Sequence, residues 1–217
     1  MVVAIDGPAG SGKGTITKLV AEKLKLVYID SGATYRCVAL ACIRNNIKLE
    51  EKDKIIELTK SLDIDFDENG KTFLNKEDVS SLIRSKEVTD IVSQISSIVE
   101  VREILVDLQR KMAIGKNVIM EGRDITTVVF PNADYKFYLD ASVTERARRR
   151  FKQNEEMGIN TSMEEIIQNI EMRDYNDMHK PVGALTRTPE QIYIDSTNMT
   201  ISEVVETIVN EINKNMA

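Results

Sequence analysis

Five short apolar runs divide the chain, and helical patterns separate them. The runs are VVAI at 2–5, LVYI at 26–29, NVIM at 117–120, YKFYL at 135–139 and QIYI at 191–194. Continuous apolar runs of this length are typical of strands that are buried on both faces. Because they alternate with helices, they predict an α/β fold with a five-stranded parallel sheet flanked by helices.

An acidic residue stands at or next to the end of each predicted strand. These residues are Asp6, Asp30, Glu121, Asp140 and Asp195. In parallel sheets, ligands bind beyond the carboxyl ends of the strands. We therefore expect the segments that follow the strands, GPAG, SGATYR, GRD, AS and ST, to line one crevice.

The segment at 31–116 is too long to be a single crossover helix. TYRCVALACIRNN predicts a first helix, and the runs DIDF and TFLN around a DENGK turn predict a small antiparallel β insertion near 60–80. Amphipathic patterns predict two further helices at Ser85–Ser97 and Glu100–Ile114. We expect a single domain over 1–217 that contains this inserted region.

The loop after the first strand has the spacing of a phosphate-binding P-loop. Gly7, Gly12 and Lys13 satisfy G-x-x-x-x-G-K, and glycines let backbone N–H groups converge at the start of the next helix. A simple strand-to-helix turn is the alternative, but the preceding strand and the helix-forming residues that follow favour a phosphate site. The GKGT ending is the form seen in P-loop kinases of small molecules. The candidate nucleotide-binding residues are Gly7, Pro8, Ala9, Gly10, Ser11, Gly12, Lys13, Gly14 and Thr15.

A net charge of −6 gives the chain no general attraction for nucleic acid or anionic membranes. The longest apolar run, CVALACI, is far shorter than a membrane span. Cys37 and Cys42 match no metal-binding spacing and are interpreted as reduced core thiols on one helix. We expect a cytoplasmic monomer with no nucleic-acid or membrane partner.

Arginines gather on one predicted helix, TERARRRFKQ. Arg146, Arg149 and Arg150 share a face by i, i+3, i+4 spacing. Such a charged face is often only solvated, but here it directly follows the fourth strand, where a lid over about 146–162 would close on triphosphate.

Two short motifs imitate a GTPase. Asp67–Gly70 matches D-x-x-G and Asn75–Asp78 matches N-K-x-D, but only a few residues separate them. We interpret them as a β-turn and a polar strand end.

Six motifs in order along the chain together resemble a bacterial cytidylate kinase. They are DSGATYR at 30–36, SQIS at 93–96, VREIL at 101–105, GRDITTVVFPNAD at 122–134, LDAS at 139–142 and RDYND at 173–177. The resemblance implies a P-loop kinase core with a monophosphate-binding region at about 31–116 and a helical lid. It also implies ATP and Mg²⁺ as cofactors and direct in-line transfer of the γ-phosphoryl group to CMP and dCMP.

The resemblance also implies roles for single residues. It places Arg36, Arg123 and Ser31 at the monophosphate, Ser93, Arg102 and Asp124 at cytosine, Arg173 and Asp177 at the ribose, and Arg149, with Arg146 and Arg150, at the ATP phosphates. Lys13, Arg123 and Arg149 are the predicted catalytic residues. Surface or helix-pairing charges are the alternative interpretation of Arg36, Arg102 and Asp124, and an ordinary polar helix position is the alternative for Ser93.

Two positions depart from the family pattern. Glu121 stands where Asp is frequent, and we predict that it and Thr15 reach Mg²⁺ only through water, with no direct metal ligand. Lys180 stands where an arginine usually contacts the monophosphate, and Arg187 is a possible substitute. His179 is not expected to act as a base, because the acceptor phosphate is already ionised.

Two alternatives remain at this point. One is another P-loop kinase, of uridylate or adenylate type, and the other is a nucleotide-binding switch protein. The sequence also leaves the preference between CMP and dCMP open.

Overall fold

The computed structural model describes residues 1–67, 69–156 and 158–214. The chain forms two compact units, and each is considered by itself. The first comprises Met1–Leu26 and Ile119–Ala217, and the second comprises Val27–Val118. Within the described ranges, no helix combines the length and the apolar character needed to cross a membrane.

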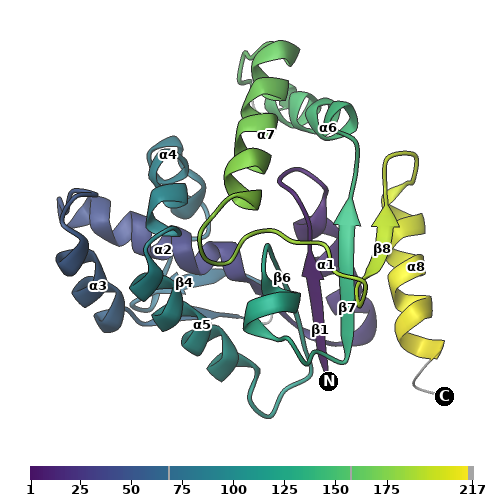
Figure 1. Cartoon of the computed structure of the whole chain (residues 1–217), viewed down its shortest axis with the longest axis horizontal. Helices are drawn as coiled ribbons and strands as arrows, with labels where there is room; N and C mark the ends of the chain where they lie inside the picture. The colour runs from purple at the N-terminus through teal and green to yellow at the C-terminus, as the bar shows by residue number, and fades with distance from the viewer. Residues whose placement is uncertain (68, 157, 215–217) are drawn as a thin grey trace. The chain divides into compact units, whose positions relative to one another are not determined.

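The predicted five-stranded parallel sheet is present, with strand order β2-β6-β1-β7-β8. Figure 1 shows β1, β7 and β8 of the first unit side by side. Its strands are β1 Val2–Asp6, β2 Val27–Asp30, β6 Val118–Gly122, β7 Tyr135–Asp140 and β8 Ile192–Asp195. In the first unit, Ile5 lies opposite Phe137, and Leu139 lies opposite Ile194. Ile5, Phe137 and Leu139 are fully buried. Burial on both faces explains why these strands are continuous apolar runs.

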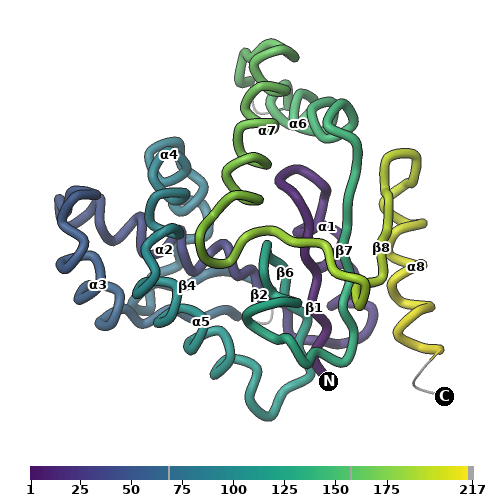
Figure 2. Tube along the Cα trace, viewed as in Figure 1, coloured from purple at the N-terminus to yellow at the C-terminus, as the bar shows by residue number. Residues whose placement is uncertain are grey.

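Helices of the first unit pack in two groups. Its helical segments are α1 Lys13–Leu24, the π-helical turn η2 Ile125–Val129, α6 Val143–Glu156, α7 Met163–Met178 and α8 Ile201–Lys214. Helices α1 and α8 pack against each other, and α6 and α7 form a hairpin, as Figure 2 shows. A capping box opens α7, because Ser162 accepts from the Glu165 N–H and the Glu165 carboxylate accepts from the Ser162 N–H.

The second unit is built around α2. Its further elements are α2 Ser31–Arg44, α3 Lys52–Ser61, β3 Ile64–Phe66, β4 Thr72–Leu74, β5 Glu77–Asp78, η1 Leu82–Arg84, α4 Lys86–Ile95 and α5 Val99–Ala113. The antiparallel sheet β3-β4-β5 is the predicted β insertion. The sequence analysis did not predict α3, whose apolar stripe is short: within this helix, Ile55 and Thr59 are the buried residues.

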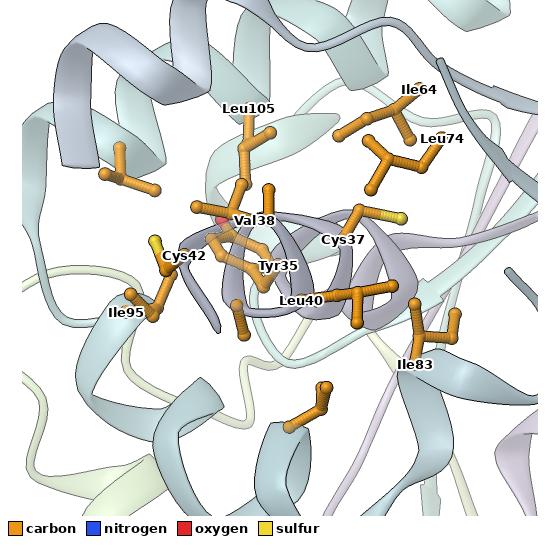
Figure 3. Packing of buried hydrophobic residues seen from close by; sticks show 14 of the residues in the cluster. Tyr35, Cys37, Val38, Leu40, Cys42, Ile64, Leu74, Ile83, Ile95 and Leu105 are labelled. Carbon is orange, nitrogen blue, oxygen red and sulfur yellow. The ribbon is translucent and has the colours of Figure 1, made fainter. Parts of the chain in front are cut away.

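Buried side chains from α2 form the centre of the second unit's core (Figure 3). Cys37 and Cys42 lie in this cluster and are both free thiols, as predicted. Burial raises the pKa of Cys37 to about 12 and that of Cys42 to about 11. Both side chains therefore act as small apolar groups.

The GTPase-like motifs form local turns within the small sheet. The Asp67 carbonyl accepts from the Gly70 N–H at 3.0 Å, while Glu68 lies outside the described residues. Asn75 and Lys76 have φ values of 50° and 69° and connect β4 to β5. The turn interpretation is confirmed, and the GTPase reading has no structural support at these positions.

Candidate active site

The phosphate loop of the first unit depends on its glycines. A Cβ atom at Gly7 would lie 2.0 Å from the Leu139 carbonyl oxygen, so only glycine allows the loop to approach β7 this closely. Gly10 and Gly12 have φ values of 78° and 90°, a region that favours glycine. Gly12 caps α1 without a side chain, which leaves the first N–H groups of the helix for an anion.

Cationic side chains bind the carbonyl groups of this loop. Lys13 Nζ donates to the Pro8 oxygen at 2.7 Å, Arg146 Nη1 to the Ala9 oxygen at 3.0 Å, and Arg149 Nη1 to the Ser11 oxygen at 3.1 Å. These carbonyls therefore have side-chain partners, while Gly12 leaves the first N–H groups of α1 for an anion.

Lys13 is buried and has an altered proton affinity. Burial, and then the nearby charge of Arg123, lower the pKa of Lys13 to about 7, while Glu121 and Asp6 act in the opposite direction. An anionic ligand would favour the protonated form. Lys13 thus lies in the loop with a charge that a bound phosphate would stabilise.

Three of the four arginines of α6 are predicted to bind the ATP phosphates, and they occupy different surroundings. Arg146 is buried and forms a bidentate pair with Asp174, with distances of 3.0 and 2.6 Å. Arg149 also binds the carbonyl of Ser196 at 2.7 Å, beside the loop. Arg150 is exposed and donates to the Gln153 side chain.

A second cationic group lies around Asp177, at the end of α7. Arg123 Nε donates to Asp177 Oδ2 at 2.7 Å, and Lys180 Nζ lies 3.0 Å from Oδ1. Burial alone would raise the pKa of Asp177, but Arg123 and Lys180 more than offset this and lower it to about 2. Burial, and next the charge of Arg123, lower the pKa of Arg173. Three cations thus surround one carboxylate, a charge balance that suits an anionic ligand.

Arg187 and His179 have packing roles. The Arg187 guanidinium lies 3.9 Å from the centre of the Tyr193 ring. His179 stacks on Tyr175, and its Nδ1 lies 2.7 Å from the Tyr175 carbonyl oxygen. Lys180, by contrast, belongs to the Asp177 group.

The sequence-predicted residues of the second unit lie on three of its helices. Ser31 opens α2, where Asp30 accepts from the Ala33 N–H at 3.0 Å as the N-cap. Arg36 binds the Ile83 carbonyl and the Thr89 hydroxyl, both at 3.0 Å, and so joins α2 to η1 and α4.

Arg102 and Ser93 complete the predicted set in this unit. The Arg102 side chain is buried, donates to the Ser96 carbonyl at 3.1 Å and lies 5.3 Å from the centre of the Tyr35 ring. Ser93 is exposed on α4, and its carbonyl accepts from the hydroxyls of Ser96 and Ser97. Arg102 therefore contacts the turn that follows the Ser93 helix.

Two oxygen donors predicted to reach Mg²⁺ through water, Glu121 and Thr15, lie in the first unit. Glu121 lies close enough to Lys13 to influence its pKa, and Thr15 is exposed in the first turn of α1. Across residues 1–67, 69–156 and 158–214, no cluster of three His, Cys, Asp or Glu side chains could hold a metal. Mg²⁺ keeps several waters and binds through few protein oxygens together with substrate phosphates.

The fold and the phosphate loop define a P-loop kinase. Solved structures with the same fold include a shikimate kinase from Bacteroides thetaiotaomicron, at 13% identity and a TM-score of 0.51, with 98% of each chain covered. A Thermus thermophilus protein has 16% identity and a TM-score of 0.51, covering 100% of this chain and 98% of its own. Identities this low establish the fold alone.

The family model described as Cytidylate kinase matches residues 3–214, and the chain belongs to the cytidylate kinase family. A cytidylate kinase of Clostridioides difficile (strain 630) is 44% identical, with 98% of each chain covered. One from Caldanaerobacter subterraneus subsp. tengcongensis is 47% identical over 98% of this chain and 95% of its own. The resemblance recognised in the sequence is confirmed.

The sequence analysis missed two partners in the site. Asp174 was quoted only as part of the RDYND motif, although it binds Arg146, and Asp6 was noted only as a strand end, although it binds the loop after β6. The position of Asp6 at the end of a predicted strand is a signal that could have indicated its role in the site. Nothing along the chain links Arg146 to Asp174, because the pair depends on how α6 packs against α7.

Proposed function

We propose that this protein transfers the γ-phosphoryl group of ATP to CMP, producing CDP and ADP. The family match over nearly the whole chain supports this activity, and it does not favour a uridylate kinase, an adenylate kinase or a switch protein. The observation that carries the proposal is the presence of two cationic groups in the first unit. One surrounds the phosphate loop at Lys13, and the other surrounds Asp177.

On the donor side, Lys13 and the N–H groups of Gly7–Thr15 bind the ATP phosphates. Arg149 adds charge from α6, where it already contacts Ser11. Arg150 is exposed one residue further on, and Arg146 would have to release Asp174 to reach a phosphate. We propose that about 146–162 acts as the lid, bringing these arginines over the triphosphate and excluding water.

Mg²⁺ would be held by the phosphates and, through water, by Thr15 and Glu121. When bound, it neutralises charge on the transferring phosphoryl group. The role of these residues is limited to orienting the metal's water ligands.

On the acceptor side, Arg123, Arg36 and Ser31 bind the 5′-phosphate. Guanidinium groups suit this task because they present two donors to two oxygens at once. Lys180 supplies a further positive charge in the place of the usual arginine. We prefer it to Arg187 because it shares Asp177 with Arg123.

The base and the sugar of the acceptor are assigned separate sets of side chains. Asp124 accepts from the exocyclic amine of cytosine, while Arg102 and Ser93 donate to the ring acceptors. Uracil would place a carbonyl against the Asp124 carboxylate. Arg173 and Asp177 hold the ribose hydroxyls, and dCMP is proposed as a second acceptor.

The reaction needs no general base, since the acceptor phosphate is already anionic. Catalysis consists of aligning two anions in line and neutralising the charge on the transferring group. Lys13, Arg123 and Arg149 are the residues proposed to do so. We also propose that the protein works as a cytoplasmic monomer on small nucleotides, with no nucleic-acid or membrane partner.

The test follows a γ-phosphoryl label from ATP in the presence of CMP. The label should appear in CDP, and ADP formation should depend on CMP. ADP formed at the same rate without any acceptor would contradict the proposal.

A further inference from the structure

A fully buried carboxylate connects the end of β1 to the loop that follows β6. Asp6 Oδ1 accepts from the Ile125 N–H at 2.8 Å, and Oδ2 accepts from the Thr126 N–H at 2.9 Å and from its hydroxyl at 2.6 Å. Asp6 has no exposed surface. Burial raises the pKa of Asp6, and these three hydrogen bonds act against that rise.

The Thr126 hydroxyl extends this contact to a third segment. It donates to Asp6 and accepts from Gln191 Nε2, while Gln191 Oε1 accepts from the Thr188 N–H at 2.7 Å. Thr126 and Gln191 are also buried. The Thr126 hydroxyl thus has a donor on one side, Gln191 Nε2, and an acceptor on the other, the Asp6 carboxylate. Its proton points toward Asp6, because only that orientation satisfies both hydrogen bonds.

The hydrogen bonds of Asp6 lie next to both the proposed ATP site and the proposed CMP site. Asp6 directly precedes Gly7 of the phosphate loop, and Ile125 directly follows the pair Arg123 and Asp124. The π-helical turn η2 begins there: the Asp124 carbonyl accepts from the Val129 N–H at 3.2 Å, and the Ile125 carbonyl accepts from the Phe130 N–H at 2.7 Å.

We propose that Asp6 and Thr126 are positioning residues for phosphoryl transfer. They hold Arg123 and Asp124 at a fixed place relative to the phosphate loop, through the backbone of Ile125 and Thr126. This inference rests on the proposed function, since it assumes that Arg123 and Asp124 bind the acceptor. A shift of about 1 Å in the position of a bound group can lower the rate about a hundredfold. Losing the hydrogen bonds that hold Arg123 and Asp124 in place should therefore lower the rate of phosphoryl transfer.

The experiment replaces the Thr126 hydroxyl and restores it. Thr126→Val removes the hydroxyl at nearly constant volume, and Thr126→Ser keeps it. We expect Thr126→Val to lower kcat/KM for CMP about tenfold, equivalent to about 1.4 kcal/mol. The KM for ATP should stay within about twofold, and Thr126→Ser should restore kcat/KM for CMP to nearly the original value.

A matched control is Thr59→Val. Thr59 is also a buried threonine whose hydroxyl bonds a neighbouring carbonyl, that of Ile55 at 2.7 Å, but it lies on α3. We expect this variant to lower the thermal midpoint while leaving both KM values unchanged. The contrast separates a loss of stability from a loss of positioning.

Asp6→Asn tests the carboxylate, with Asp140→Asn as its control. Asp140 is likewise a strand-end carboxylate that accepts from the following N–H, at 2.8 Å. We expect the Asp6 variant alone to lose CMP turnover. In an Asp124→Ala background, Thr126→Val should cause a smaller loss than in the original protein, because the part of its effect that acts through Asp124 is already gone.

Equal kinetics for Thr126→Val and the original protein would overturn the inference. So would an equal loss for Thr126→Val and Thr126→Ser, or full additivity with Asp124→Ala. If the unaltered protein fails to phosphorylate CMP, the proposed function itself fails, which distinguishes the two outcomes.

Discussion

Arg123 donates from Nε to Oδ2 of Asp177 across 2.7 Å, which joins the loop after β6 to the last turn of α7. Both side chains are mostly buried, so water screens the pair only weakly. A residue proposed to bind the acceptor phosphate is thus oriented by one proposed to bind the ribose. Four predictions concern the groups around this pair and the phosphate loop, and the last concerns the acceptor.

Replacing Arg123 by Lys should preserve the charge and remove the planar fork. We expect kcat/KM for CMP to fall about tenfold to a hundredfold, in line with the loss of a charge-assisted hydrogen bond. The KM for ATP should stay nearly constant. Arg148→Lys is the matched control, because Arg148 makes a bidentate contact with Glu145 on the exposed side of α6. Unaltered CMP kinetics in the Arg123 variant would remove this residue from the acceptor site.

Lys13 should take up a proton when ATP binds. Its pKa of about 7 lies below the ordinary 10.5, so the free protein carries a largely neutral Lys13 between these values. Bound phosphates favour the charged form. ATP affinity should therefore decrease as the pH rises above about 7. Calorimetry in buffers of different ionisation enthalpy measures the uptake.

Lys13→Ala provides the reference for that measurement. It should abolish the uptake assigned to Lys13 and nearly all turnover, while CMP binding remains measurable. Lys18→Ala, an exposed change on the same helix, should alter neither. The role of Lys13 would be refuted by an active Lys13→Ala protein.

Asp124→Ala should reduce activity toward CMP far more than toward UMP. In the proposed role, the carboxylate accepts from the cytosine amine and repels the uracil carbonyl, so its removal should cost only CMP a hydrogen bond. Initial rates with both acceptors give the ratio. An equal loss for CMP and UMP would mean that Asp124 does not read the amine.

Lys180→Ala should raise the KM for CMP, and Arg187→Ala should not. Lys180 shares Asp177 with Arg123, while Arg187 stacks on Tyr193. Steady-state kinetics with varied CMP distinguish the two variants. The opposite result would assign the family's usual arginine role to Arg187.

The strands, the phosphate loop and most helices were predictable because their signals are local. Continuous apolar runs marked β1 and β7, and the glycine spacing marked the loop between β1 and α1. The π-helical turn η2 has no such signal in the sequence. Its first N–H groups bind Asp6 of β1, a contact between segments far apart in the chain.

The site was less predictable than the fold. The i, i+3, i+4 spacing placed the α6 arginines on one face but could not indicate that Arg146 is buried against Asp174 while Arg150 is exposed. The spacing of residues along a helix shows which side chains share a face, but the residues that those side chains contact belong to the neighbouring helix. The roles assigned to the site residues are proposals, and the variants described above test several of them.

An acceptor comparison tests the central claim most directly. ADP formation from ATP and Mg²⁺ is measured with CMP, dCMP, UMP, AMP and GMP at equal concentrations, together with a sample that lacks an acceptor. We predict the highest kcat/KM for CMP, activity with dCMP and much less with the remaining three. A preference for UMP or AMP, or ADP formation that does not depend on any acceptor, would contradict the assignment.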